Sequence, residues 1–551
     1  MSNAKKAPVL GIDLGTTKCL ACIMQPGEER PTIVRPNPAL AEDLMPSVFC
    51  MHENEPLVGS HACDKLSDPR YRQEVVRCVK RFMDQSVALF PRSCPRFSAI
   101  EISAWYLRHL RRRAEEQLEL KEGDITRAVV TVPAYFGQIE RRHTRAAAKK
   151  AGFDEAQLLD EPIAAAIGLQ LHKDPGRQLV MVVDLGGGTL DVTLLWVGQG
   201  VGDCGFAELG RYGYIGVGGV DWDAVIAKLA FYPHKLRRDA NYLQPDNIFL
   251  FDPSERLKID FSETPSLEKG LVTFADEELG NLDTIVKRSE FLAQSQPLAE
   301  LCIRVCDGLL NFIPRAELSP VRRSRKSWFD YLRSTRLKKV TWRDIDKVLM
   351  VGGGSRTQAV QDIIAERWGQ KPEIAPRPQY QVGFGAAWCA GGLFHNGSIP
   401  DNILRSPHTI GHYYYPRGPG PNKPKVFAPV IYRNERISQV DERTLDVSAV
   451  CNGTTLSVDL AEERLNPKKG GTEYVDIGRI TLTNLPPRES RKEKVELQLQ
   501  CQNDRDMEIT ATFRGQHQTV NLDADTSCGP ANNESGNSHA TNGGTPKSGA
   551  S

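Results

Sequence analysis

The feature that most restricts the fold of this chain is a signature that occurs twice. Each copy is a short apolar strand followed by an aspartate, a glycine-rich turn and a threonine. The first strand is residues 9–12 and leads into Asp13. The second is residues 180–183 and leads into Asp184, about 170 residues later. Two copies so far apart predict two hairpins at corresponding places in the two halves of one fold.

The residue types in both turns suit the binding of a phosphate. Glycine lets backbone N–H groups approach phosphate oxygens without a Cβ in the way, and threonine hydroxyls add further donors. One carboxylate from each hairpin can hold a Mg²⁺ ion, largely through its bound water. The candidate phosphate-site residues are Asp13, Gly15, Thr16, Thr17, Asp184, Gly186, Gly187, Gly188, Thr189 and Asp191.

A third glycine cluster supports the same interpretation. Gly352, Gly353 and Gly354 follow the apolar run 348–351 and precede Ser355 and Arg356. Glycines at the end of a strand permit close backbone approach to a ligand. We therefore expect this cluster to lie against the sugar or base of a nucleotide.

Strand-like runs alternate with amphipathic stretches up to about residue 395, and this pattern predicts α/β layers around a buried sheet. The 70 Lys and Arg residues nearly balance the 69 Asp and Glu residues, so composition indicates neither nucleic acid nor a membrane surface as partner. No apolar run approaches the roughly 20 residues that span a bilayer. We expect a cytoplasmic protein.

The pattern changes beyond about residue 396. Pro and Gly are frequent up to residue 429, and from residue 443 apolar residues recur with period two between Asn-containing turns, which predicts an antiparallel β-sandwich. The tail after Leu522 has no large aliphatic residue and should be disordered. The expected divisions are 7–395 for an α/β domain, 396–428 for a linker and first sandwich segment, 429–522 for the sandwich and 523–551 for the tail.

Several motifs together resemble one branch of the actin, hexokinase and heat-shock ATPase superfamily. They are 11–17, 130–136, 160–166, 183–191 and 351–356. These motifs are similar to those of the seventy-kilodalton heat-shock chaperones of the DnaK type, well over 7–395 and more weakly to about 522. Sugar kinases share the hairpins but lack the Val-Pro-Ala-Tyr-Phe segment.

The resemblance implies a two-lobed, actin-like ATPase with duplicated ribonuclease H-like lobes, followed by the sandwich. It implies that Lys80 positions the attacking water and that Glu161 orients metal-bound water. Asp184 and Thr189 complete the catalytic set, with ATP or ADP and Mg²⁺ as cofactors, and Pro133 and Arg141 link the ATP state to the sandwich. The further nucleotide contacts implied are Gly218, Gly219, Glu255, Lys258, Ser262, Gly352, Gly353 and Arg356.

The function implied is that of a chaperone in which slow ATP hydrolysis controls binding of unfolded polypeptide segments. A J-domain co-chaperone and a nucleotide exchange factor are further partners of such proteins. An alternative is a nucleotide-gated adaptor that hydrolyses little ATP and docks a dedicated partner. A small-molecule kinase is disfavoured because no sugar-site Asp or Asn is identifiable between the hairpins.

The chain departs from the family pattern at several places. Lys18 replaces a small polar residue, and Arg377-Pro-Gln379 replaces Asn-Pro-Asp. Gln157 and Asp160 replace residues of the J-domain contact. The linker, 401–407, keeps only two of its usual apolar residues, and no room remains after Leu522 for the family's helical lid. The basic, aromatic-containing stretch 315–343 fits a solvated helix or insertion better than a nucleic-acid contact.

Overall fold

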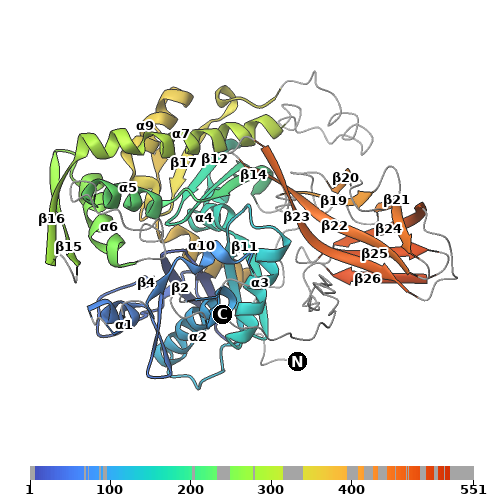
Figure 1. Cartoon of the computed structure of the whole chain (residues 1–551), viewed down its shortest axis with the longest axis horizontal. Coiled ribbons are helices and arrows are strands. Elements are labelled where there is room, and N and C mark those ends of the chain that lie inside the picture. Colours follow the sequence, from blue (N-terminus) through green and yellow to red (C-terminus); the bar gives the residue numbers. More distant parts are fainter. Residues whose placement is uncertain are drawn as a thin grey trace, which may run out of the picture.

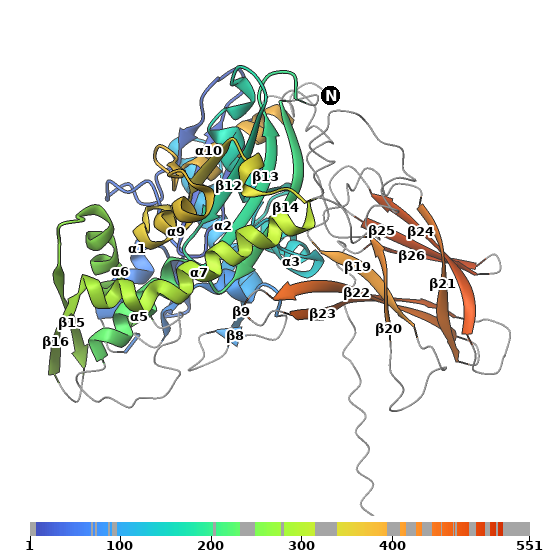
Figure 2. The same ribbon diagram turned by 90° about the horizontal axis from the view of Figure 1, so that it is seen from above.

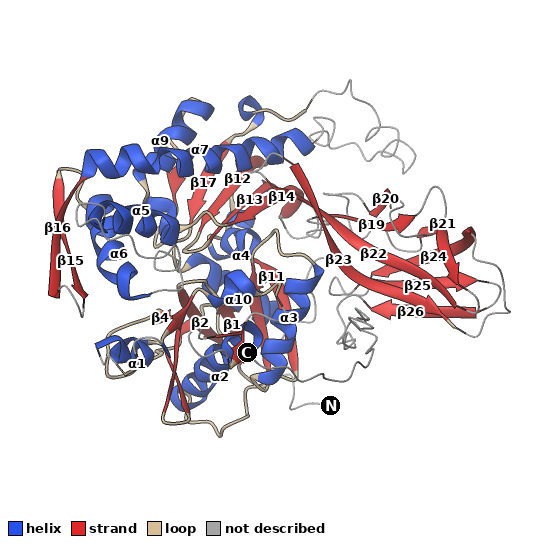
Figure 3. Cartoon of the chain, viewed as in Figure 1, coloured by secondary structure: helices blue, strands red, loops and turns tan. Residues whose placement is uncertain are grey.

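The computed structural model is a mixed α/β structure with several sheets (Figures 1 and 3). None of the helices in the part of the chain described below is both long and apolar enough to cross a membrane. The structure describes residues 7–67, 70–71, 74–85, 89–90, 96–201, 205–231, 248–276, 280–313, 339–393, 408–414, 426–431, 443–452, 455–466, 468, 471–483, 492–501, 507–513 and 516–521.

The first sheet has six strands and is built around the first copy of the duplicated signature. Strands β1 and β2 form an antiparallel hairpin, and β10 lies parallel to β1 on its other side. The order is β11-β10-β1-β2-β3, with β4 also paired to β2. The strands are β1 (Val9–Asp13), β2 (Lys18–Met24), β3 (Thr32–Ile33), β4 (Met45–Pro46), β10 (Arg127–Val132) and β11 (Glu155–Asp160).

The second sheet repeats this arrangement around the second copy. Strands β12 and β13 form an antiparallel hairpin, and β17 lies parallel to β12. The order is β14-β13-β12-β17-β18. The strands are β12 (Gln178–Leu185), β13 (Thr189–Val197), β14 (Phe206–Ile215), β17 (Lys347–Val351) and β18 (Glu373–Ile374).

Helices cover both sheets and separate them. Helix α2 begins with a capping box in which Ser98 and Glu101 satisfy each other's backbone N–H groups. Helices α4 and α10 pack on each other between the sheets (Figure 1) and share an apolar cluster with both, including Val9 and Val180. The helices are α1 (Ser60–Cys63), α2 (Ala99–Gln117), α3 (Gln138–Lys150), α4 (Glu161–Gly168), α5 (Gly219–Phe231), α6 (Ile248–Glu263), α7 (Arg288–Phe312), α9 (Gln358–Trp368) and α10 (Gln381–Gly391).

Shorter elements extend both halves. The hairpin β15–β16 projects from the second half, away from the C-terminal strands (Figure 2). The other short elements are β5 (Val48–His52), β6 (Glu55–Val58), β7 (Val76–Arg77), β8 (Leu89–Phe90), β9 (Phe97–Ser98), β15 (Lys269–Asp276), β16 (Gly280–Lys287) and the 3₁₀ turns Asp64–Ser67, Val79–Phe82, Leu171–Lys173, Trp342–Asp344 and Gly353–Arg356.

The C-terminal part forms one antiparallel sheet of eight strands. Its order is β20-β19-β22-β21-β24-β25-β26, with β23 also paired to β22. Strand β22 is long, and its pairing with β23 shifts register between Leu460 and Ala461, which leaves Ile477 of β23 as the extra residue. The strands are β19 (Thr409–Tyr414), β20 (Val426–Ile431), β21 (Arg443–Asn452), β22 (Thr455–Asn466), β23 (Gly471–Leu482), β24 (Lys492–Cys501), β25 (Met507–Phe513) and β26 (Gln516–Asn521).

The coarse predictions from sequence are confirmed, since the chain is α/β at its start and antiparallel β at its end. The expected boundary at 428/429 falls within β20. The expected sandwich architecture and the domain divisions stay predictions. The tail 523–551, which we expect to be disordered, the linker 401–407 and nearly all of the basic stretch 315–343 lie outside the described residues, so these predictions are not tested.

Candidate nucleotide site

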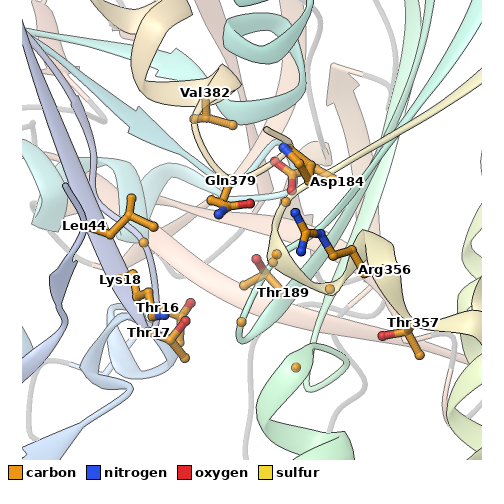
Figure 4. Close-up of a pocket in the computed structure, with 18 of the residues that line it drawn as sticks. Thr16, Thr17, Lys18, Leu44, Asp184, Thr189, Arg356, Thr357, Gln379 and Val382 are labelled. Atoms are coloured by element: carbon orange, nitrogen blue, oxygen red, sulfur yellow. The ribbon is translucent and has the colours of Figure 1, made fainter. Parts of the chain in front are cut away.

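The three glycine-containing motifs meet at one cavity of about 330 Å³ between the first and second sheets. Thr16, Thr17 and Lys18 lie on one side of it, and Thr189 and Arg356 lie on the other (Figure 4). The residues predicted from sequence that line the cavity are Asp13, Gly15, Thr16, Thr17, Lys80, Glu161, Asp184, Gly186, Gly187, Thr189, Gly219, Glu255, Lys258, Ser262, Gly352, Gly353 and Arg356.

The two glycine-rich hairpins approach each other so closely that only glycine fits between them. A Cβ on Gly187 would lie 2.2 Å from the Thr17 hydroxyl oxygen, and one on Gly188 would lie 2.4 Å from the Thr16 methyl carbon. Such distances are far below van der Waals contact. The glycines therefore let two hairpins from different sheets form one lining.

Lys80 and Glu161 form a buried ion pair beside the hairpins. The Lys80 Nζ lies 2.5 Å from Glu161 Oε1, and the two side chains are 5% and 8% exposed. Lys80 is in the 3₁₀ turn Val79–Phe82, which Cys78 precedes with a left-handed φ of 60°. Strained backbone of this kind is concentrated at functional sites. Burial opposes the charge on Lys80, but Glu161 and Asp13 outweigh it and raise the Lys80 pKa.

Carboxylates outnumber cations at this end of the cavity. Burial, and then repulsion from Glu161, raise the pKa of Asp13 to about 7. The same two causes raise the pKa values of Asp184 and Asp191 well above their ordinary range. No three His, Cys, Asp or Glu side chains in the described ranges are arranged to ligate one metal ion directly. A cation bound here would nevertheless offset the repulsion and hold these carboxylates in their charged form.

The far end of the cavity is lined by one face of α6. Glu255, Lys258 and Ser262 lie there, as their i, i+3 and i+7 spacing predicts. Lys258 Nζ is 2.7 Å from the buried Asp223 Oδ1. Burial raises the pKa of Asp223 to about 6, against the opposing effect of Lys258.

Gly352 completes the cavity where the third cluster meets the second hairpin. Its φ is +80°, and a Cβ there would lie 2.4 Å from Asp184 Oδ1. Both facts require glycine at this position. The third cluster can therefore pass directly behind a carboxylate of the second hairpin.

Comparison with known proteins places this site in a family. A family model described as Hsp70 protein matches residues 86–538. A curated relative, the chaperone protein DnaK of Metamycoplasma hominis, is 29% identical over 486 residues, which cover 87% of this chain and 73% of the relative.

The chain belongs to the Hsp70 family.

It is an ATP-dependent chaperone, and its enzymatic activity is that of an ATPase. The resemblance seen in the sequence motifs is thereby confirmed. Members of the Hsp70 family bind nucleotide and unfolded polypeptide clients. Neither comparison favours the adaptor alternative.

Three predicted nucleotide contacts of this Hsp70 chain lie beside the cavity and do not line it. They are Gly188, Asp191 and Gly218. Asp191 is fully buried and accepts a hydrogen bond of 3.2 Å from the Tyr135 backbone N–H. A Cβ on Gly218 would lie 2.6 Å from the Gly188 backbone. These residues support the hairpin from behind.

Sequence reasoning missed Arg81, which bridges the two halves beside the cavity. Its Nε donates to the Gly188 carbonyl at 2.9 Å, and its Nη2 lies 2.5 Å from Asp221 Oδ2. Its place beside Lys80 in the Val-Lys-Arg-Phe motif was the available signal. Gly354 of the third glycine cluster also lines the cavity. The other cavity-lining residues not assigned to the site from sequence are Lys18, Leu44, Ile259, Glu263, Thr357, Pro378, Gln379 and Val382.

The two predicted coupling residues lie next to the C-terminal sheet. Pro133 directly follows β10, and Arg141 lies near the start of α3 and donates to the Phe136 carbonyl at 2.8 Å. At the start of α3, Arg464 of β22 pairs with both oxygens of Glu140 at 2.6 and 2.8 Å. His408 bonds the Tyr135 carbonyl at 2.6 Å.

Asp160 is not exposed, as a residue of a co-chaperone contact would have to be. Its side chain is buried, and Arg141 and Arg211 hold its two oxygens. A co-chaperone could not reach this carboxylate from solvent.

Proposed function

We propose that the cavity binds ATP with its phosphates between the two hairpins and its adenosine between α6 and the third glycine cluster. The observation that carries this proposal is the meeting of Lys80, Glu161, Asp184 and both glycine-rich turns at one cavity. Its volume, about 330 Å³, falls at the lower end of the range for small-molecule sites. Glu255, Lys258, Ser262 and Arg356 would contact the adenosine.

The donor set fits a hydrated Mg²⁺ ion, because Asp13 and Asp184 bring hard oxygen ligands from the two hairpins to one cavity. When bound, the ion would neutralise charge on the β- and γ-phosphates. Asp13 and Asp184 would hold it through its water shell.

In the hydrolytic step, we propose that Lys80 Nζ orients the attacking water and contacts the γ-phosphate. The water oxygen forms a bond to the γ-phosphorus as the bond to the bridging oxygen of ADP breaks. Glu161 keeps the Lys80 ammonium charged and directed, as their 2.5 Å separation supports. Phosphoryl transfer to water relies mainly on positioning and charge, so turnover should be slow.

We further propose that the two similar sheets are the duplicated lobes of an actin-like ATPase spanning 7–395 and that β19–β26 belong to a client-binding sandwich. The contact of Arg464 with Glu140 supports a coupling between them, because it joins β22 to the helix that follows Pro133. Extended apolar polypeptide would be the client. A J-domain co-chaperone and an exchange factor remain proposed partners.

The test is single-turnover ATP hydrolysis by the full chain, with and without an extended apolar peptide. A matched peptide with its apolar residues replaced by Asp and Lys is the control. Slow hydrolysis that only the apolar peptide accelerates is expected. Hydrolysis indifferent to both peptides would contradict the coupling and favour the adaptor, whereas failure to bind ATP would contradict the site itself.

A further inference from the structure

A buried network of four charged side chains joins the second sheet to the residue just before Glu161. Arg211 of β14 pairs with Asp160 at the end of β11, and Arg141 of α3 pairs with the other Asp160 oxygen at 2.6 Å. Glu208 of β14 holds the Arg211 guanidinium through two hydrogen bonds of 2.6 Å. All four side chains are at most 4% exposed.

A β-bulge makes this network possible. Glu208 and Arg211 are three residues apart, and in a regular strand such residues face opposite sides. The register between β13 and β14 shifts so that Leu194 pairs with Gly210 but Leu195 pairs with Glu208, which leaves Leu209 as the extra residue. The bulge therefore allows both side chains to reach one side of the sheet, where Glu208 fixes Arg211.

Asp160 takes part in this network, and its side chain does not cap the helix that follows it. It is the N-cap of α4, where an aspartate ordinarily accepts hydrogen bonds from the first N–H groups of the helix. Here its side chain caps no N–H group of α4. Both carboxylate oxygens accept from guanidinium groups, one of them from the other sheet.

The network lies immediately behind the residues proposed to carry out hydrolysis. Asp160 is joined by one peptide bond to Glu161, which pairs with Lys80. On the other side, β14 pairs with β13, the strand that begins at Thr189 in the second hairpin. The Arg211–Asp160 contact thus ties the second hairpin's sheet to the backbone that carries Glu161.

We propose that Arg211, held by Glu208, is a positioning residue for ATP hydrolysis that fixes Glu161 and Lys80 relative to the second phosphate hairpin. This inference rests on the proposed function of the cavity. Arg211 acts through Asp160 and contacts no nucleotide. Because the four charges sum to zero, Arg211 and Glu208 can be removed together without leaving a net charge in the interior.

The central test compares the double variant Glu208→Leu/Arg211→Leu with the parent chain. Leucine fills much of the space and leaves Asp160 paired with Arg141, so we expect the variant to fold. We expect its ATP affinity to stay within about threefold and its single-turnover rate to fall about tenfold or more, as for lost positioning. Arg211→Lys keeps the charge but loses the fork geometry, and should give an intermediate rate.

The matched control is Lys347→Leu/Glu373→Leu. These two residues lie on the second sheet, as Glu208 and Arg211 do. Lys347 Nζ is 2.8 Å from Glu373 Oε2, and the pair does not reach Asp160. Its single-turnover rate should equal that of the parent. Melting temperatures of all variants report folding.

A parental rate in the folded double variant would overturn the inference and leave the proposed function standing. A parallel loss of ATP affinity, hydrolysis rate and melting temperature would also overturn it, because the pair would then act only on stability.

If the parent itself hydrolyses no ATP, the proposed function fails. Hydrogen exchange then tests separately whether Arg211 and Glu208 fix the segment that carries Glu161. Protection of 155–168 on ATP addition in the parent but not in the double variant would support it; equal protection in both would overturn it.

Discussion

At the scale of single residues, the site depends on opposite charges held out of water. Lys80 is buried among carboxylates and keeps its charge because Glu161 lies 2.5 Å away. Asp223 is buried near Lys258 and has a raised pKa. The protonation state of each residue thus depends on its burial and on its partner, and substitution of one residue has measurable consequences.

Lys80→Ala should abolish measurable hydrolysis or reduce it by about 100-fold or more, since it removes a preorganised donor to the reacting phosphate. ATP affinity should stay within about tenfold, because most of the proposed phosphate contacts come from the hairpins. Single-turnover hydrolysis and equilibrium ATP binding measure the two quantities. Lys347→Ala, at a lysine that pairs with Glu373, is the matched control. Unchanged turnover in Lys80→Ala would refute its assignment.

The raised pKa of Asp223 predicts that the stability of the folded state depends on pH. Its folded pKa of about 6 lies above the ordinary 3.8, so the folded state binds the proton more tightly. The stability that this tighter proton binding adds to the folded state is therefore fully present below about pH 4, and it is lost as pH rises through 6. Relative to Asp223→Asn, the parent should lose roughly 1–2 kcal/mol between pH 4.5 and 7.

The measurement for Asp223 is the melting temperature of parent and variant across this pH range in the absence of nucleotide. As pH rises, the melting temperature of the parent should fall relative to that of the variant. A constant difference, or a shift toward the parent, would contradict a raised pKa.

At the scale of secondary-structure elements, the two sheets are held together by helices that touch backbone to backbone. A Cβ on Gly385 of α10 would lie 1.7 Å from the Ala164 carbonyl oxygen of α4. A Cβ on Gly11 of β1 would lie 1.9 Å from the Ala387 nitrogen. Neither neighbour is a flexible side chain that could move aside. Helix α10 therefore fits between α4 and β1 only because these positions are glycine.

Gly385→Ala should destabilise the protein by about 2 kcal/mol or more, because the new methyl group forces the α4 and α10 backbones apart. Gly392→Ala is the matched control, since that glycine ends the same helix and has nothing within 4 Å of its would-be Cβ. Denaturant unfolding followed by helix content compares the two variants. Similar stabilities would show that the helices tolerate a wider separation.

At the scale of the whole molecule, the C-terminal sheet contacts the α/β part of the chain through buried charges on β22. Glu462 is 1% exposed and accepts from the Gln138 N–H at 3.1 Å. Arg464 is 11% exposed and lies between Glu462 and Glu140. Burial raises the pKa of Glu462, and Arg464 opposes this effect. Removal of the arginine would leave two glutamates facing each other.

Arg464→Ala should weaken the contact of β22 with α3 and abolish acceleration of ATP hydrolysis by peptide, with basal hydrolysis within about twofold of the parent. The physical reason is the uncompensated buried charge that remains. Arg479→Ala removes an arginine of β23 that pairs with Asp459 at the exposed surface and serves as the control. Full peptide stimulation in Arg464→Ala would rule out this route of coupling.

The sequence by itself determined the local parts of this protein. Two hairpins, the α6 face with Glu255 and Lys258, and the third glycine cluster were predicted because strand, turn and helix patterns depend on near neighbours in the chain. The roles of Lys80 and Glu161 came from the family motif and remain predictions. The period-two apolar pattern runs through Leu456, Val458 and Leu460 and stops at the charged residues after Ala461, so it does not indicate the last part of β22.

The tertiary structure decided the contacts between distant segments. Pairing with β23 extends β22 to Asn466 and brings Arg464 to Glu140, although 324 residues separate them. The bulge at Leu209 directs Arg211 to Asp160, and Arg81 pairs with Asp221 beside the cavity. These side chains look like ordinary solvated charges in the sequence, because the burial that gives them a partner exists only after the sheets have packed.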